Sequence, residues 1–331
     1  MTINAFRALV VEEVNETIQA SVKEINLEDL SAGETLIKTS YSGINYKDAL
    51  ATIKNGGVIR SYPMIPGVDA VGEIIETTAP NFKKGDKVVI TGNGLGVSHT
   101  GGFSEVIRVP NEWVIALPET VSEKEAATIG TAGITAIESI NELEKNGLSD
   151  KTARILVTGA TGGVGSVAIA MLKSLGYENI TALSRKKNEE YLLDLGASKV
   201  ISLDEFMPEK VKPLAKQEYD FVLDTIGGET LSAILPQISY GGAITLCGNA
   251  SGIKLSTTVL PFILRGVNML GIDSVQLPND KKIAIWERIG KELDKDLLSK
   301  IGAVEEPLDN IETIVGKLLD GTHSGRTLIK L

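Results

Sequence analysis

The spacing of hydrophobic and polar residues changes part-way along the chain. Up to about Leu117, short apolar runs such as "ETLIKTS", "VGEIIET" and "DKVVITG" alternate with polar residues and are separated by Gly, Pro and Asn. Alternation with a period of two, bounded by turn residues, is typical of antiparallel β-structure. The first part of the chain is therefore predicted to be a β-rich domain.

The pattern then becomes that of an α/β protein. After the helical stretch "VSEKEAATIGTAGITAIESI", strand, glycine turn and helix follow one another repeatedly up to about Val275. The strands are expected at Ile155–Gly159, Ile180–Ser184, Lys199–Leu203, Phe221–Asp224 and Ala243–Cys247. The helices between them are expected at Gly163–Leu175, Asn188–Leu195 and Glu229–Ile238. This order predicts a doubly wound parallel sheet.

The last part of the chain is predicted to return to the β-rich domain. It carries a charged helix around Lys281–Leu297, a second helix at Asn310–Leu319 and a final strand in "RTLIKL". A length of 331 residues is consistent with two packed domains.

Composition excludes several classes of protein. A net charge of -10 argues against nucleic-acid binding, which requires a broad basic surface. A single cysteine, Cys247, cannot form an internal disulfide or a thiolate metal cluster, which fits a reducing compartment. The N-terminal "MTINAFRALVVEEVNE" has neither the apolar core of a signal peptide nor a membrane-spanning length. We expect a cytoplasmic protein without membrane or nucleic-acid partners.

The segment "ILVTGATGGVGSVAIAMLKSLG" carries a dinucleotide-binding fingerprint. Ala160, Gly162 and Gly165 have the spacing of G-x-G-x-x-G, with alanine in the first position. Gly162 lets the backbone approach a pyrophosphate, Gly165 lets the helix pack closely on the strand, and the helix N-terminus attracts phosphate. A glycine-rich turn without a ligand is the alternative. We favour binding because strand, turn and helix follow in register.

The residues after the second strand indicate which dinucleotide is bound. NAD-binding proteins present Asp or Glu there to the ribose hydroxyls, whereas this chain has Ser184, Arg185, Lys186 and Lys187. A carboxylate would repel a 2′-phosphate, while Ser184 and Arg185 can bind one. A solvated basic start to the next helix is the alternative, although cations there oppose the helix dipole. The sequence predicts NADPH and leaves open whether Arg185 or Lys186 binds the phosphate.

Several separate motifs resemble one known family. "GDKVVITG", "GTAGITA" and "VTGATGGVGS" resemble the medium-chain dehydrogenase/reductase superfamily over essentially the full length. "GINYKDAL", "YPMIPGVDAVG", "TTVLPFILRGVNMLGIDSV" and "GRTLIKL" are similar to its YhdH/YhfP group of quinone oxidoreductases, which includes acrylyl-CoA reductases. The resemblance implies a GroES-like catalytic domain, residues 1–125 and 277–331, around a Rossmann domain, residues 126–276. It also implies a homodimer.

The resemblance also implies catalysis without metal. In the zinc alcohol dehydrogenases of this superfamily, a cysteine and a histidine bind zinc where this chain has Asn45 and Val68. Asn45 is a poor zinc ligand and Val68 is none. Addition of a hydride to an activated C=C bond needs only that the adjoining carbonyl holds the negative charge. Reduction of a conjugated alkene or a quinone is therefore expected.

The resemblance assigns roles to individual residues. Tyr46 of "NYKD" is expected near the nicotinamide as orienting group or proton donor, with a structural tyrosine as the alternative, and Asp48 is expected to fix that turn. The remaining cofactor contacts are expected from Thr161, Gly162, Gly163 and Val164 (pyrophosphate), Ser184 and Arg185 (2′-phosphate), Thr135 (ribose), Asn249, Ile263 and Ser274 (nicotinamide side), and Arg326 (cofactor or substrate phosphate).

The leading hypothesis is an NADPH-dependent reductase of acrylyl-CoA or a similar short enoyl-CoA. An NADPH:quinone reductase and a cofactor-binding protein without catalytic role are the alternatives. Sequence does not rank the acceptors, because substrate contacts come from loops.

Overall fold

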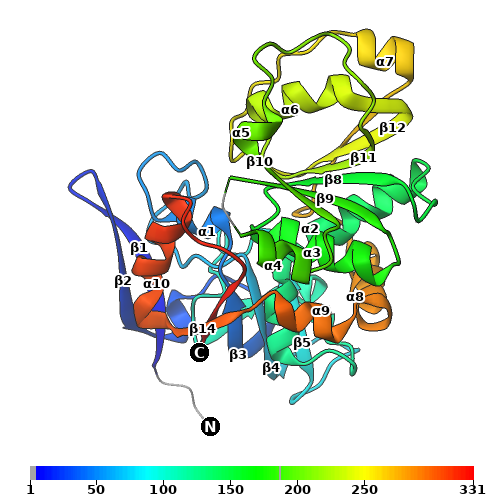
Figure 1. Ribbon diagram of the computed structural model, residues 1–331. Coiled ribbons are helices and arrows are strands. Elements are labelled where there is room, and N and C mark those ends of the chain that lie inside the picture. Colours follow the sequence, from blue (N-terminus) through cyan, green and yellow to red (C-terminus); the bar gives the residue numbers. More distant parts are fainter. Residues whose placement is uncertain (1–4, 186–187) are drawn as a thin grey trace. The chain divides into compact units, whose positions relative to one another are not determined.

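The computed structural model describes residues 5–185 and 188–331, which form two compact units (Figure 1). The first unit contains the chain up to Thr131 together with Ser274–Lys291 and Ala303–Leu331. The second unit contains Ala132–Asp273 and Glu292–Gly302. Both ends of the chain therefore contribute to the first unit, and a central segment forms most of the second.

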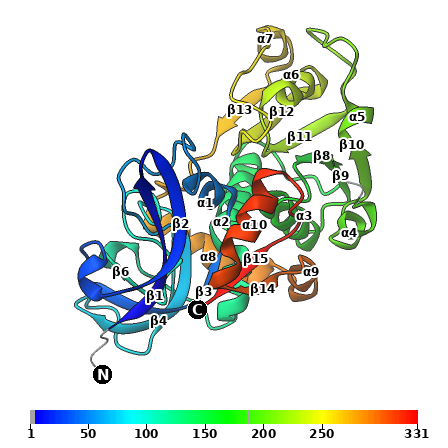
Figure 2. The same cartoon turned by 90° about the vertical axis from the view of Figure 1, so that its left-hand side faces the viewer.

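The first unit is built mainly from antiparallel strands. The strands β1 and β2 form a hairpin (Figure 2), and the larger sheet has the order β14-β15-β3-β4-β5-β7, with β6 also paired to β3. The strands are β1 (Phe6–Val14), β2 (Thr17–Ile25), β3 (Thr35–Gly43), β4 (Asp69–Thr77), β5 (Lys87–Thr91), β6 (Val106–Val109), β7 (Ile115–Ala116), β14 (Val304–Pro307) and β15 (Thr327–Lys330). The helices of this unit are α1 (Tyr46–Ala51), α8 (Asn279–Glu292) and α10 (Ile311–Leu319).

Alternating apolar residues hold this larger sheet together. Ile37 of β3, Ile74 of β4 and Ile90 of β5 belong to one buried cluster and are fully shielded from solvent. Burial of such side chains contributes about 1.5–3 kcal/mol each. The sheet is thus a firm base for the turns that follow β3 and precede β4.

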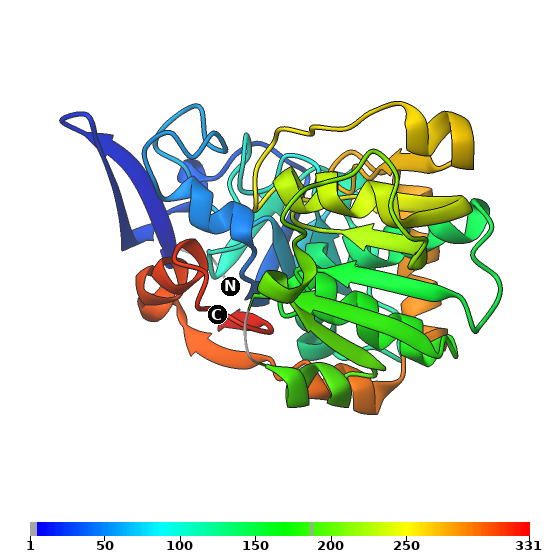
Figure 3. The same ribbon diagram turned by 45° about the horizontal axis from the view of Figure 1, so that its top comes forward.

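The second unit has a parallel sheet with the order β10-β9-β8-β11-β12-β13 (Figure 3). Its strands are β8 (Arg154–Thr158), β9 (Asn179–Ser184), β10 (Lys199–Ser202), β11 (Tyr219–Asp224), β12 (Ile238–Leu246) and β13 (Asn268–Gly271). Its helices are α3 (Gly163–Ser174), α4 (Glu189–Asp194), α5 (Leu203–Phe206), α6 (Gly228–Ile234), α7 (Leu260–Arg265) and α9 (Lys295–Lys300), while α2 (Glu123–Lys145) begins in the first unit and ends in the second. The strand order reverses between β8 and β11, so the prediction of a doubly wound α/β sheet is confirmed.

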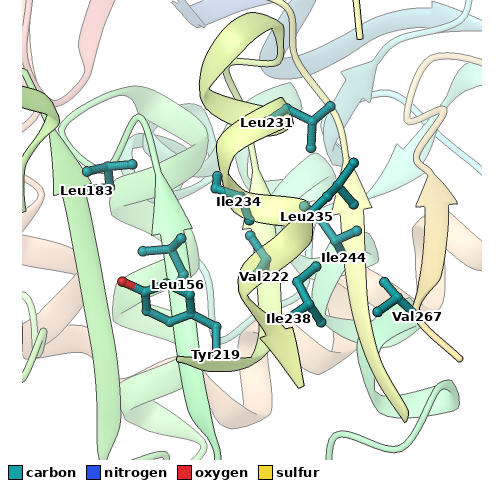
Figure 4. Packing of buried hydrophobic residues seen from close by; sticks show 10 residues of the cluster. All are labelled: Leu156, Leu183, Tyr219, Val222, Leu231, Ile234, Leu235, Ile238, Ile244 and Val267. Carbon is teal, nitrogen blue, oxygen red and sulfur yellow. The ribbon is translucent and has the colours of Figure 1, made fainter. Parts of the chain in front are cut away.

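Apolar side chains join α6 to the parallel sheet (Figure 4). Leu231 and Ile234 of α6 belong to the same buried cluster as Leu156 of β8, Val222 of β11 and Ile244 of β12. In parallel sheets both faces are covered, which is why these strands are continuously apolar rather than alternating. The cluster therefore fixes α6 against three neighbouring strands of the sheet.

Two predicted helices were wrong in extent. The single helix expected at Lys281–Leu297 is two helices, because Asp294 lies between α8 and α9 and accepts hydrogen bonds from the Asp296 and Leu297 N–H groups. The helix expected to run to Ile238 ends at Ile234, where Pro236 forms a short 3-10 turn. None of the helices within the described residues has both the length and the apolar composition needed to cross a membrane.

Candidate active site

The glycine turn lies between β8 and α3 in the second unit. Gly159 follows the strand with a φ of 56°, and its carbonyl accepts a hydrogen bond of 2.9 Å from the Gly162 N–H. A Cβ at Gly165 would lie 2.5 Å from the Gly159 oxygen, so the helix start packs against the turn only because Gly165 has no side chain. Gly162 is the N-cap residue of α3. The first N–H groups of a helix have no partner within it and suit a phosphate group.

Ser184 and Arg185 lie at the carboxyl end of β9, the parallel neighbour of β8. The Ala160 N–H donates to the Leu183 carbonyl at 3.2 Å, which ties the turn to the end of β9. Ser184 is buried, and its Oγ lies 3.5 Å from Thr161 Oγ1, whereas Arg185 is exposed. Lys186, the other candidate for the 2′-phosphate, lies outside the described residues. The structure therefore brings Thr161, Ser184 and Arg185 to one edge of the parallel sheet.

The other predicted cofactor residues are divided between the units. Gly163 and Val164 begin α3, Asn249 is exposed after β12, and Ile263 is 67% exposed in α7. Thr135 is buried in α2, within the second unit. Tyr46, Ser274 and Arg326 belong to the first unit. The proposed contacts of all these residues with a cofactor stay predictions.

In the first unit, Tyr46 begins the short helix α1 and is 42% exposed. The preceding residue, Asn45, caps the helix, and its backbone N–H donates to Asp48 Oδ2 at 2.8 Å. Asp48 Oδ1 accepts from the N–H groups of Gly67, at 3.2 Å, and Val68, at 3.0 Å. Asp48 thus joins two segments: the turn that contains Tyr46 and the segment before β4.

Burial changes the acid–base behaviour of Asp48. Its side chain is 1% exposed, and desolvation, together with the nearby charge of Asp69, raises the pKa of Asp48 to about 7. The hydrogen bonds from Asn45 and Val68 oppose this shift. A carboxyl group with this pKa titrates near neutral pH.

A second buried carboxyl group, Asp69, is the centre of a polar network. Asp69 Oδ1 accepts from the Gly43 N–H at 2.7 Å, and Oδ2 accepts from Asn45 Nδ2 at 2.9 Å and from the Thr131 N–H at 3.1 Å. Arg326 Nη2 lies 3.8 Å from the same Oδ2. Burial raises the pKa of Asp69, and the positive charge of Arg326 opposes that rise.

Arg326 is bonded to main-chain and side-chain oxygens of the first unit. Its Nε donates to the Thr128 carbonyl at 2.8 Å, and Nη1 donates to the Ile44 carbonyl at 2.9 Å and to Asn45 Oδ1 at 3.1 Å. The side chain is 2% exposed. These contacts give Arg326 a part in holding Asn45, while its expected contact with a cofactor or substrate phosphate stays a prediction.

The sequence is similar to those of known proteins along both units. A family model described as an alcohol dehydrogenase GroES-like domain matches residues 31–119, and one described as a zinc-binding dehydrogenase matches residues 163–289. The acrylyl-CoA reductase AcuI of Ruegeria pomeroyi is 40% identical over 328 residues, which are 98% of each chain. The chain belongs to the medium-chain dehydrogenase/reductase superfamily.

Solved structures of the superfamily also match along the whole chain. The yhdH oxidoreductase of Salmonella enterica, in complex with NADP, is 39% identical with a TM-score of 0.94, covering 98% of this chain and 99% of that one. The yhfP protein of Bacillus subtilis, with NAD bound, is 42% identical with a TM-score of 0.95, covering 99% and 100%. The resemblance to the YhdH/YhfP group is confirmed, and so is the combination of a GroES-like fold with a Rossmann sheet. The protein is an oxidoreductase of this superfamily.

Asn45 and Val68, the positions at which the family resemblance implies zinc ligands in alcohol dehydrogenases, have no side chain suited to zinc. The Asn45 amide donates to Asp69 and to the Gly43 carbonyl, at 3.1 Å, and its oxygen accepts from Arg326. Val68 offers no ligand atom in its side chain. Within residues 5–185 and 188–331, no group of three or more His, Cys, Asp and Glu side chains is placed to hold a metal ion. The residues at these positions do not fit zinc.

Sequence reasoning missed Asp69 and the inward position of Arg326. In the sequence, Asp69 is visible only as an acidic residue that follows Val68 in "PGVDAVG". An acidic residue beside an apolar strand start does not reveal its partner, because Arg326 lies near the other end of the chain. The network becomes visible only when β3, β4 and the C-terminal strand are placed together.

Proposed function

We propose that this protein is an NADPH-dependent reductase of an activated C=C bond, with acrylyl-CoA or a similar short enoyl-CoA as its substrate. The observation that carries the proposal is the network of Asn45, Asp69 and Arg326. The family resemblance implies a zinc ligand at the position of Asn45 in alcohol dehydrogenases, whereas here the Asn45 amide is bonded to both charged side chains, so we assign a reaction that needs no zinc. The name of the R. pomeroyi relative, acrylyl-CoA reductase, supports the choice of substrate.

The glycine turn and the end of β9 would hold the cofactor. Thr161, Gly162, Gly163 and Val164 surround the start of α3, whose N–H groups suit the pyrophosphate. Ser184 can donate a hydrogen bond to a 2′-phosphate, and the guanidinium of the exposed Arg185 can donate two charge-assisted hydrogen bonds to it. The NADP in the S. enterica relative supports this assignment. The B. subtilis relative has NAD bound, so the test below measures the preference between NADPH and NADH directly.

The chemistry divides between cofactor and protein. When bound, NADPH supplies a hydride for the β-carbon of the alkene. The protein must orient the substrate and provide a proton for the neighbouring carbon, from a side chain or from water. Tyr46 is our candidate for this role because the residue is partly exposed at the start of α1, next to a turn that is fixed by the hydrogen bond from the Asn45 N–H to Asp48. We further propose a homodimer, as the family resemblance implies, and a cytoplasmic location, as expected from the single cysteine and the N-terminal sequence.

The test is a comparison of acceptors with the purified full-length protein. NADPH oxidation is followed with acrylyl-CoA, crotonyl-CoA and a simple quinone, each with NADH in parallel and after dialysis against EDTA. We expect the largest kcat/KM for a short enoyl-CoA with NADPH, unchanged by EDTA. A larger value for the quinone would move the protein to the quinone reductases. Tight NADPH binding without turnover of any acceptor would contradict an enzymatic role.

A further inference from the structure

Asp224 is a fully buried carboxyl group at the end of β11. It lies where the order of the parallel sheet reverses, since β11 pairs with β8 on one side and β12 on the other (Figure 2). In doubly wound sheets, ligands bind outside the carboxyl ends of the strands at this reversal. A buried carboxylate at that place is costly unless hydrogen bonds compensate for its lost hydration.

The bonds of Asp224 join two loops. Its Oδ1 accepts from the Thr158 hydroxyl at 2.7 Å, and its Oδ2 accepts from the Gly227 N–H at 2.8 Å. The same Thr158 Oγ1 accepts from the Thr225 N–H at 2.9 Å. The carboxylate therefore fixes both the end of β8 and the loop that leads into α6.

This arrangement continues into the glycine turn. Thr225 Oγ1 donates to the Thr158 carbonyl at 2.9 Å, and a Cβ on Gly159 would overlap with that hydroxyl oxygen. Gly159 in turn accepts from the Gly162 N–H, the N-cap residue of α3. The start of the turn at Gly159 is thus fixed by a chain of contacts that runs through Thr225 and Thr158 to Asp224.

We propose that Asp224 is a positioning residue for dinucleotide binding, acting through Thr158 and Thr225 to hold the glycine turn in its binding form. The inference rests on the proposed function, because that function supplies the ligand of the turn. It assigns Asp224 no contact with the cofactor and no part in the chemistry.

The opposite end of the same strand offers a matched control. Asp220 also joins β11 to β8, accepting from the Arg154 N–H at 2.8 Å and from Arg154 Nη2 at 2.7 Å. That bond lies at the amino ends of the strands, away from the glycine turn, and both side chains are partly exposed. Asp220→Asn therefore loosens the same strand pair without touching the turn.

The test measures the Kd of NADPH by fluorescence titration, at a temperature where circular dichroism shows each variant folded. In Asp224→Asn the amide has one acceptor oxygen, so either the Thr158 hydroxyl or the Gly227 N–H loses its acceptor. We expect the Kd to rise about tenfold, which corresponds to about 1.4 kcal/mol. Thr158→Val should raise it similarly, Thr158→Ser should keep it near the wild-type value, and Asp220→Asn should leave it unchanged.

The outcomes separate this inference from the proposed function. Wild-type affinity in both Asp224→Asn and Thr158→Val would overturn the role of Asp224, as would an equal loss in Asp220→Asn. A wild-type protein that binds NADH instead of NADPH would overturn the cofactor assignment alone. The ratio of variant to wild-type Kd, measured with NADH, would then decide the role of Asp224, because the pyrophosphate is common to both dinucleotides.

Discussion

Arg326 and Asp69 face each other inside the first unit, with Nη2 of the guanidinium 3.8 Å from Oδ2 of the carboxylate. Their side chains are 2% and 1% exposed. Asn45 joins them, since it donates to the carboxylate and accepts from the guanidinium. The pair thus holds the residue that caps the helix of Tyr46.

Removal of the cation should strongly destabilise the fold. Arg326→Met leaves Asp69 as a buried charge without its counter-ion, which costs about 3 to 5 kcal/mol. The free energy of unfolding from urea titrations tests this. Arg7→Met is the control, because Arg7 pairs with Asp309 in a largely exposed ion pair, and such pairs contribute about 1 kcal/mol or less. Equal losses in the two variants would contradict a structural role for the buried pair.

The pKa of about 7 at Asp48 gives the fold a defined pH dependence. An unfolded aspartate titrates near pH 4, so between about pH 4 and pH 7 the folded protein holds the extra proton. The contribution of Asp48 to stability therefore falls as pH rises through this window and is constant above it, a change of a few kcal/mol at most.

Urea unfolding of the wild type and of Asp48→Asn at intervals from pH 5 to pH 8 measures this contribution. As pH rises to about 7, the unfolding free energy of the wild type should fall relative to that of Asp48→Asn. A difference that does not change with pH would show that Asp48 has an ordinary pKa.

Local signals and distant contacts were not equally predictable. The glycine turn was expected from one continuous segment, because the strand, the glycines and the helix start are adjacent in the chain. The helical stretch around "GTAGITA" was also expected, but Gly130 in it has a φ of 47° and breaks the regular helix. A Cβ there would overlap with Asp69 Oδ2, and the next N–H, of Thr131, donates to that oxygen. A tertiary hydrogen bond thus overrides a local helical preference.

Arg185 should decide between the two dinucleotides. Arg185→Ala removes a charge-assisted contact with the 2′-phosphate and should raise the KM for NADPH about tenfold or more. The KM for NADH should not change, because NADH has no 2′-phosphate. Lys210→Ala, at an exposed lysine of the same unit, is the control for a general loss of positive charge. An unchanged preference in Arg185→Ala but a reduced one in Lys186→Ala would assign the phosphate to Lys186.

Tyr46→Phe separates the chemical role of the phenol from a structural one. Because Tyr46 is 42% exposed, loss of its hydroxyl should leave the midpoint of thermal unfolding nearly unchanged. If the phenol donates the proton, kcat should fall about a hundredfold, with little change in the Kd of NADPH. If it only orients the substrate, the KM for the enoyl-CoA should rise more than kcat falls. Tyr240→Phe, at a tyrosine 79% exposed in the other unit, should change neither. Wild-type kinetics in Tyr46→Phe would show that the proton comes from water or from another side chain, because this variant has no hydroxyl at the start of α1.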